Sequence, residues 1–244
     1  MKNKLYIVGI GSGDRKSLTL KAIEVIQTCD MIVGYKRYIQ YIEDLIEDQE
    51  IFSTGMKKEI ERCTKALECA REGKKVAMIS SGDAGVYGMA GPILQLKAEK
   101  FPDVDVEVIP GITAMNLGAA ALGAPLMHDT AIISLSNLLT PWETIEKRLE
   151  HAAAGDFVIA LYNPRSNGRP HLLKRARDII AKHKQLNTPV GIVKHAGREK
   201  EELFLSTLKD FNDEWVDMNS IVIIGNSCSF ISNNLFITPR GYHI

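Results

Sequence analysis

Short apolar runs rich in Val and Ile alternate with amphipathic stretches along this chain. In the first half, four predicted strands share this character: residues 5–10, 31–33, 76–80 and 104–109. Amphipathic stretches such as 20–26 and 60–70 separate them, with apolar side chains on one helical face and charged side chains on the other. Strand followed by helix, repeated, predicts an α/β fold with mostly parallel sheets.

A second α/β region follows Pro110-Gly111, where we place a junction between domains of residues 1–112 and 113–244. Its predicted helices are 142–153 and 172–182, and its predicted strands are 131–135, 157–162, 190–194, 203–208 and 221–224. Thr140, Pro141 and Glu143 predict the start of the first helix, with Thr140 as N-cap of a capping box.

Composition excludes several classes of protein. The 244 residues are 45% hydrophobic, so the chain can bury a core without disulfides. It carries 30 Lys+Arg against 30 Asp+Glu, and this balance does not favour nucleic acid or a membrane as its partner. The four cysteines lie in no paired spacing, and the opening ten residues are too short for a signal peptide. We therefore expect a cytoplasmic protein without a metal site.

Charge is uneven locally. Residues 161–200 hold ten Lys and Arg against Asp178 and Glu199, a local excess of 10 − 2 = +8. Such a segment suits a small polycarboxylate better than a long nucleic acid.

Three loops of small residues follow predicted strands: Gly9–Asp14, Ser80–Gly88 and Pro110–Ala114. The first is not a dinucleotide fingerprint, because Asp14 stands where the third glycine is required and no acidic residue follows strand 31–33. Each loop alone is more often a simple turn than a site. Three of them at the carboxyl ends of strands predict one ligand-binding crevice.

An ordered series of motifs resembles the tetrapyrrole (corrin/porphyrin) methylases, which use S-adenosylmethionine. The motifs are GIGSGD (9–14), SSGDAGVYGMAG (80–91), PGITA (110–114), ISLSNLLTPWE (133–143), LYNPRS (161–166), KHAGR (194–198) and TPRGY (238–242). The combination is most similar to the members that methylate C-17 of precorrin-3B or cobalt-factor III, with ring contraction, in cobalamin biosynthesis. The resemblance implies two α/β domains with mixed, mostly parallel sheets, a cofactor cleft between them, and a homodimer.

Site residues follow from the resemblance motif by motif. The residues implied to bind the methyl donor are Ser81, Gly82, Asp83, Val86, Thr113, Ala114, Asn163 and Ala196. Those implied to bind the tetrapyrrole are Gly11, Ser12 and Gly13 of the glycine loop and the cations Arg165, Arg198 and Arg240, which can fork onto its carboxylates. The chain departs from the family pattern at Thr130 and Asn137. Family members often carry an aspartate at the second position, so Asn137 could not fill an acid/base role of that carboxylate.

Methyl transfer from a sulfonium requires placement rather than a nucleophilic residue, whereas ring contraction requires acid/base help. Candidates are Asp14, His195, and His128 beside Asp129, for which a surface His-Asp turn is the alternative.

Other functions remain open: a methylase acting at another corrin position or on uroporphyrinogen, diphthine synthase, a nucleotide-binding redox module, or a non-catalytic binding module. Without an appended domain in the sequence, we expect the cobalt-dependent variant.

Overall fold

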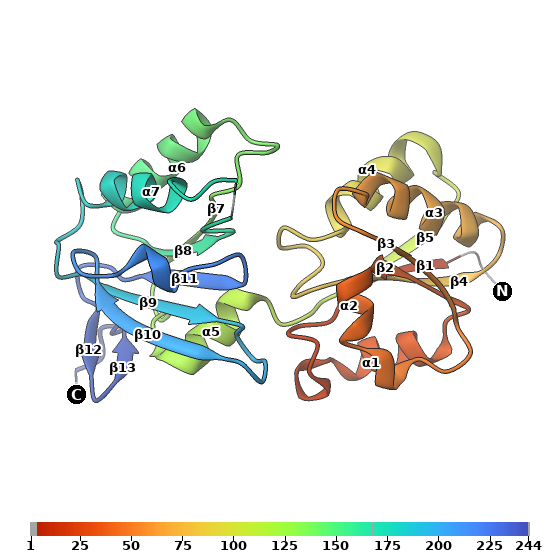
Figure 1. The fold of residues 1–244 in the computed structure, drawn as a ribbon, viewed down its shortest axis with the longest axis horizontal. Helices are drawn as coiled ribbons and strands as arrows, with labels where there is room; N and C mark the ends of the chain where they lie inside the picture. Colours follow the sequence, from red (N-terminus) through yellow and green to blue (C-terminus); the bar gives the residue numbers. More distant parts are fainter. Residues whose placement is uncertain (1–3, 167, 244) are drawn as a thin grey trace. The chain divides into compact units, whose positions relative to one another are not determined.

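The computed structural model describes residues 4–166 and 168–243. Contacts within the chain divide it into two compact units, Met1–Ala114 and Met115–Ile244, which we call unit 1 and unit 2 (Figure 1). The sequence placed the junction after residue 112.

Unit 1 contains a five-stranded sheet whose neighbouring strands are all parallel. Its strands are β1 (Lys4–Gly9), β2 (Met31–Tyr35), β3 (Glu50–Thr54), β4 (Lys75–Ser80) and β5 (Asp105–Ile109), in the order β3-β2-β4-β1-β5. Its helices are α1 (Leu20–Thr28), α2 (Lys36–Gln40), α3 (Glu59–Arg71) and α4 (Ala90–Lys100), with short 3-10 turns η1 (Arg15–Ser17) and η2 (Glu43–Leu45). Figure 1 shows α3 and α4 on one face of the sheet and α1 and α2 on the other.

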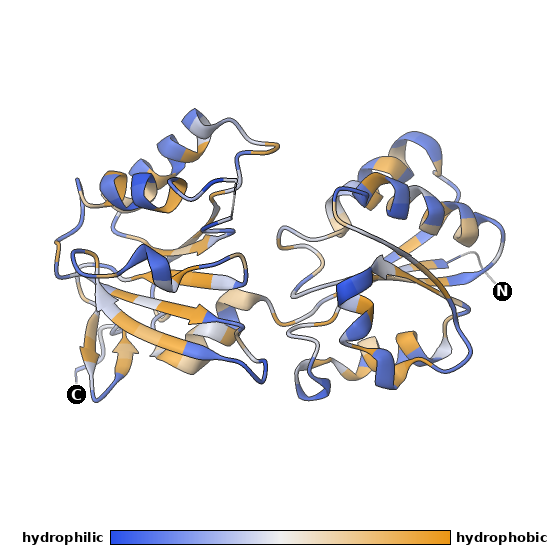
Figure 2. Ribbon diagram, in the orientation of Figure 1, coloured by the Kyte–Doolittle hydropathy of each residue, from blue (hydrophilic) through white to orange (hydrophobic). Residues whose placement is uncertain are grey.

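Alternation of side chains along each strand explains the two layers. In β4, Val76 and Met78 enter the core under α3 and α4, whereas Ala77 and Ile79 enter the core on the α1 side. Because successive side chains point to opposite faces and both faces are covered, the strand is apolar throughout, as Figure 2 shows for the interior of each unit.

Unit 2 contains a second five-stranded sheet, which is mixed. Its strands are β7 (Thr130–Ser134), β8 (Val158–Tyr162), β9 (Pro189–Lys194), β10 (Glu202–Thr207) and β11 (Ser220–Ile224), in the order β10-β9-β11-β8-β7. Strands β7 and β8 are parallel, because a helix connects them, whereas the other neighbours are antiparallel. The mostly parallel arrangement expected from the sequence therefore describes unit 1 better than unit 2.

Helices cover both faces of this sheet. A single apolar core lies beneath α6 (Trp142–Ala154) and α7 (Leu172–Ile180), and α5 (Ala114–Leu122) packs on the other face, where a Cβ on Gly118 would lie 2.6 Å from Ile221. A small sheet of β6 (Gly123–Ala124), β13 (Leu235–Ile237) and β12 (Phe230–Ser232), and a 3-10 turn η3 (Asp213–Trp215), complete the unit.

The predicted capping box of α6 is wrong, although the helix begins at Trp142, where its predicted range begins. Pro141 occupies the N-cap position with extended backbone (φ −55°, ψ 141°) and makes no side-chain capping bond. The helix begins at Trp142, so Thr140 lies outside it and forms no capping box.

Two kinds of feature are absent from residues 4–166 and 168–243. No helix there is long and apolar enough to cross a membrane, and no group of three or more His, Cys, Asp or Glu side chains is arranged to hold a metal ion.

Candidate functional site

The three small-residue loops of unit 1 lie side by side. Strands β4, β1 and β5 are neighbours and parallel, so the loops that follow them meet at one edge of the sheet. Gly11 and Gly82 exchange two backbone hydrogen bonds of 3.0 and 2.8 Å. A Cβ on Gly111 would lie 2.2 Å from the Gly82 carbonyl oxygen, so only glycine permits this approach.

Asp83 ties two of these loops together. Its Oδ1 accepts from the Gly85 amide at 2.7 Å, and its Oδ2 accepts from the Gly111 amide at 3.0 Å. The half-buried carboxylate therefore sets the spacing between the loops after β4 and β5. Each carboxylate oxygen has a second lone pair with which a ligand hydroxyl can bond.

The predicted donor-binding residues of unit 1 gather at this edge. Ser81, Gly82, Asp83 and Val86 follow β4, and Thr113 and Ala114 follow β5. A Cβ on Gly82 would have Thr113 Cα (3.8 Å) and Ala114 N (4.0 Å) as its nearest contacts, so the space between the two loops is open on this side. These residues form a cradle of mostly small groups at the carboxyl edge of the unit 1 sheet.

The glycine loop is shaped by its own contacts. Gly11 and Gly13 have positive φ (58° and 92°), and Ser12 is buried with its Oγ 2.7 Å from Ser17 Oγ. The exposed Asp14 carboxylate accepts from the Lys16 amide at 3.2 Å and caps the turn η1. Within this loop Gly11 pairs with Gly82 of the Asp83 loop, and Asp14 has a local structural partner.

In unit 2 a corresponding edge collects several loops. Strands β7, β8 and β9 end there, and the antiparallel β11 begins there. The Asn163 side chain donates to Ser134 Oγ at 3.0 Å, and the His195 amide donates to the Asn219 carbonyl at 3.1 Å. Asn163, Ala196, Arg165 and Arg198, all predicted from motifs, therefore share this edge, which we call the unit 2 loop edge.

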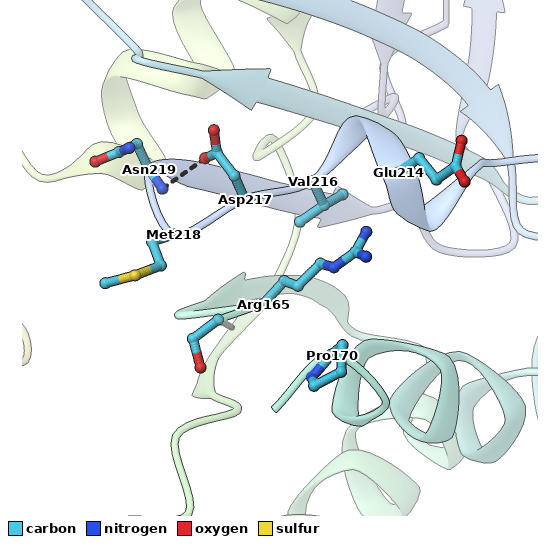
Figure 3. Close-up of a pocket in the computed structure, with 8 residues that line it drawn as sticks. Arg165, Pro170, Glu214, Val216, Asp217, Met218 and Asn219 are labelled. Carbon is cyan, nitrogen blue, oxygen red and sulfur yellow. Dashed lines mark hydrogen bonds between the residues drawn. The ribbon is translucent and has the colours of Figure 1, made fainter. Parts of the chain in front are cut away.

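A pocket of about 750 Å³ opens at the unit 2 loop edge (Figure 3). It is lined by Arg165, Ser166, Pro170, Glu214, Val216, Asp217, Met218 and Asn219. Arg165 Nη1 donates to the Asp213 carbonyl at 2.5 Å, and Asp217 Oδ1 accepts from the Asn219 amide at 2.7 Å. Most lining residues are polar or charged, and Pro170, Val216 and Met218 are the apolar ones, so the pocket suits a polar ligand.

Two features of the unit 2 loop edge lie outside the predicted set of site residues. Arg169 donates to Ser136 Oγ at 2.7 Å and to Ser166 Oγ at 3.1 Å, and so joins the loops after β7 and β8. Residues 214–219, which supply five of the eight lining residues, carried no motif. The position of Arg169 in a loop beside a motif was a sequence signal for a site residue. Residues 213–219 gave no such signal, because they lie about fifty positions from Arg165 in the chain and meet it only in the folded structure.

The structure corrects the prediction for His128 and Asp129. Both are exposed and precede β7, and the Asp129 carbonyl accepts from the Val158 amide at 2.9 Å at the start of β8. They lie at the opposite end of β7 from the unit 2 loop edge, five residues or roughly 16 Å away. Their sequence proximity to a strand does not place them with Arg165, and their acid/base role stays a prediction.

Arg240 is also separated from Arg165 and Arg198. Two residues before it, Thr238 Oγ1 lies 2.7 Å from Ser229 Oγ, and Ser229 Oγ contacts Asn226 Oδ1 at 3.0 Å beyond the end of β11. Because β11 is antiparallel to β8, this is the edge opposite the loops. The C-terminal motif follows the small sheet and does not bring its arginine to the pocket within unit 2.

The basic segment 161–200 does not form one patch. The Lys184 side chain is buried (2% exposed) against Asp156 at the opposite edge of the sheet, and burial lowers its pKa. Burial acts to raise the pKa of Asp156, but hydrogen bonds from Ser227 and Lys184 hold it below its usual value. Arg175 lies over the Trp142 ring and near Glu146. Much of the local positive charge is therefore compensated by acids elsewhere in the chain.

Comparisons with known proteins agree with this geometry. The family profile "Tetrapyrrole (Corrin/Porphyrin) Methylases" matches residues 4–212. A probable cobalt-factor III C(17)-methyltransferase of Salmonella typhimurium is 52% identical over 98% of this chain and 99% of its own length. A precorrin-3B C(17)-methyltransferase of Sinorhizobium sp. is 37% identical over 99% and 98%. The crystal structure of the methyltransferase CobJ superimposes with a TM-score of 0.90 at 35% identity, over 96% of this chain and 99% of that chain.

Proposed function

Because this chain belongs to the tetrapyrrole (corrin/porphyrin) methylase family, we propose that it is an S-adenosylmethionine-dependent methyltransferase that methylates C-17 of cobalt-factor III with ring contraction. The observation that carries the proposal is the 52% identity, over nearly the full length of both chains, with a probable cobalt-factor III C(17)-methyltransferase. The relative named for precorrin-3B is 37% identical, which favours the cobalt-containing acceptor. The reaction belongs to cobalamin biosynthesis.

In this proposal the loops of unit 1 bind the methyl donor. The donor supplies a methyl group already activated by the sulfonium charge. The chain contributes placement: Asp83 is fixed by two amides and offers its remaining lone pairs to hydroxyl groups, and Gly82 leaves room beside Thr113 and Ala114. Fixed placement of two reactants supplies up to about 7–11 kcal/mol of the barrier.

The unit 2 loop edge supplies the remaining contacts. Asn163 and Ala196 complete the donor-binding set, and Arg165 and Arg198 bind carboxylates of the acceptor. For the proton transfers of ring contraction, Asp14 and His195 remain as candidates, since each lies in a loop at the carboxyl edge of its own sheet. Gly11, Ser12 and Gly13 border the macrocycle.

Cellular setting and assembly are part of the proposal. Cys29, Cys63 and Cys69 are buried free thiols, which suits the reducing cytoplasm. We expect a homodimer, and light scattering after size exclusion tests it: a mass near 27 kDa rather than twice that value would contradict it.

Two measurements test the reaction. Calorimetry with S-adenosylmethionine and with NAD separates a methylase from a redox module, and NAD binding without donor binding would contradict the proposal. Incubation with a methyl-labelled donor and, in parallel, cobalt-factor III, precorrin-3B or uroporphyrinogen III identifies the acceptor. We expect the labelled methyl group in cobalt-factor III. Label found only in uroporphyrinogen III would reject the C-17 assignment.

A further inference from the structure

The loops that form the donor cradle of unit 1 contain no cation. Residues 9–14, 80–91 and 110–114 include Asp14 and Asp83 but neither Lys nor Arg. If a polycarboxylate macrocycle is bound at this edge, as the proposed function requires, its negative charge must be met by side chains from other elements.

Sheet topology brings such side chains to the same edge. All five strands of unit 1 are parallel in the order β3-β2-β4-β1-β5, so the segments after β1, β2 and β3 open where the Asp83 loop opens. Six cations lie just beyond these strand ends: Arg15, Lys16, Lys36, Arg37, Lys57 and Lys58. From β3 to β1 the edge spans three strand spacings, about 14 Å, which is comparable to the width of a four-ring macrocycle.

The segment after β2 touches the glycine loop directly. A Cβ on Gly13 would lie 2.5 Å from the Cβ of Tyr41, which follows α2. Lys36 and Arg37 are the first residues of α2, and both are exposed. They therefore belong to the surface that continues from the glycine loop.

The segment after β3 is held by a buried arginine. Arg62 is 4% exposed, and its Nη1 donates to Thr54 Oγ1 at 2.7 Å and to the Gly55 carbonyl at 2.9 Å. This clamp fixes the start of the turn in which Lys57 has a positive φ of 63°. The exposed Lys57 is thus presented from an anchored turn.

Most nearby acids already have partners, whereas four of the six cations do not. Arg15 lies near Asp44 and Lys58 pairs with Glu61, while Glu59 pairs with Arg62. Within residues 4–166 and 168–243, the side chains of Lys16, Lys36, Arg37 and Lys57 form no hydrogen bond or ion pair. We call these four residues the edge cations.

We propose that the edge cations bind peripheral carboxylates of the tetrapyrrole acceptor and thereby contribute to its affinity and orientation. This inference rests on the proposed function and adds a set of acceptor-binding residues in unit 1 to the arginines of unit 2. Exposed cations pair with carboxylates weakly one at a time, so we expect the four to act together.

The test compares two variants with the same change of charge. The first carries K16Q, K36Q, R37Q and K57Q. The matched control carries K100Q, K147Q, R148Q and K209Q, which also removes three lysines and one arginine, all exposed and outside the proposed site. Circular dichroism melts verify that both variants fold.

Initial rates with cobalt-factor III and labelled donor give the result. We expect the edge variant to raise KM for the acceptor about tenfold and to weaken its dependence on salt, with the donor Kd unchanged by calorimetry and the control like wild type. Equal KM in both variants would overturn the inference while leaving the proposed function intact. If wild type methylates no acceptor, the proposed function fails, and titration with uroporphyrin as a polycarboxylate probe still tests the edge cations: equal Kd in both variants rejects them.

Discussion

Both carboxylate oxygens of Asp83 accept hydrogen bonds from backbone amides, one in its own loop and one in the loop after β5. An asparagine has one acceptor oxygen, so its amide nitrogen would face one of the two N–H groups. Asp83→Asn should therefore cost about 1–3 kcal/mol in local stability and weaken donor binding at least tenfold. Calorimetry with S-adenosylmethionine measures the affinity, and D103N, an exposed aspartate, is the control. Wild-type affinity in D83N would contradict the role.

The Asp156–Lys184 pair at the far edge of the unit 2 sheet gives a prediction about pH. Asp156 has a positive φ of 55°, which asparagine tolerates, and its side chain is 45% exposed against a buried Lys184 at 3.2 Å. Asp156→Asn leaves the amine without its carboxylate and should lower the free energy of unfolding at pH 7 by about 1–2 kcal/mol, less than for a fully buried pair because solvent screens the aspartate.

The sign with pH follows from the lowered pKa of Asp156. A carboxylate with a lowered folded pKa stabilises the protein above its ordinary pKa, about 3.9, and this contribution is lost as pH falls through the folded value. Urea titrations should therefore show the difference between wild type and D156N shrinking below about pH 4. K184M in the D156N background should recover part of the loss, whereas a difference independent of pH would contradict the pairing.

Among the elements, the glycine loop after β1 is the most sensitive to side-chain size. Gly13 combines a φ of 92° with contact against Tyr41, so Gly13→Ala should destabilise the loop by about 1–3 kcal/mol. Gly91 is the contrasting case: it lies in α4, where a Cβ would have no heavy atom within 4 Å, and Gly91→Ala should stabilise by about 0.5–1 kcal/mol. Urea unfolding of the two variants checks both signs, and equal effects would refute the argument.

Elements were predicted well where the pattern is local. The strand of residues 76–80 and the loop that follows it were visible because apolar runs and glycines act over a few residues. The capping box of α6 was wrong because Pro141, and not Thr140, occupies the N-cap position. His128 and Arg240 lie away from Arg165, and the sequence could not show this because it does not tell at which edge of a sheet a residue lies.

For the whole molecule, the reactivity of the four cysteine thiols measures how tightly the cores are packed. Cys29, Cys63 and Cys69 are buried and Cys228 is exposed. Burial raises the pKa of Cys29 and of Cys63 to about 11, so little thiolate forms at pH 8. Ellman's reagent should titrate one thiol rapidly in the native protein and four in urea. Two or more rapid thiols would show that a core opens more readily than the packing indicates.

The α/β class, the family and the three small-residue loops could all be predicted from the amino-acid pattern, because periodicity and motif order are properties of neighbouring residues. Which loops share an edge became visible in the folded chain. The strand order β3-β2-β4-β1-β5 brings Lys36 and Lys57 to the edge that holds Asp83, and the antiparallel β11 brings residues 217–219 to Arg165. Strand order and direction depend on packing between residues far apart in the chain, and no local pattern encodes them.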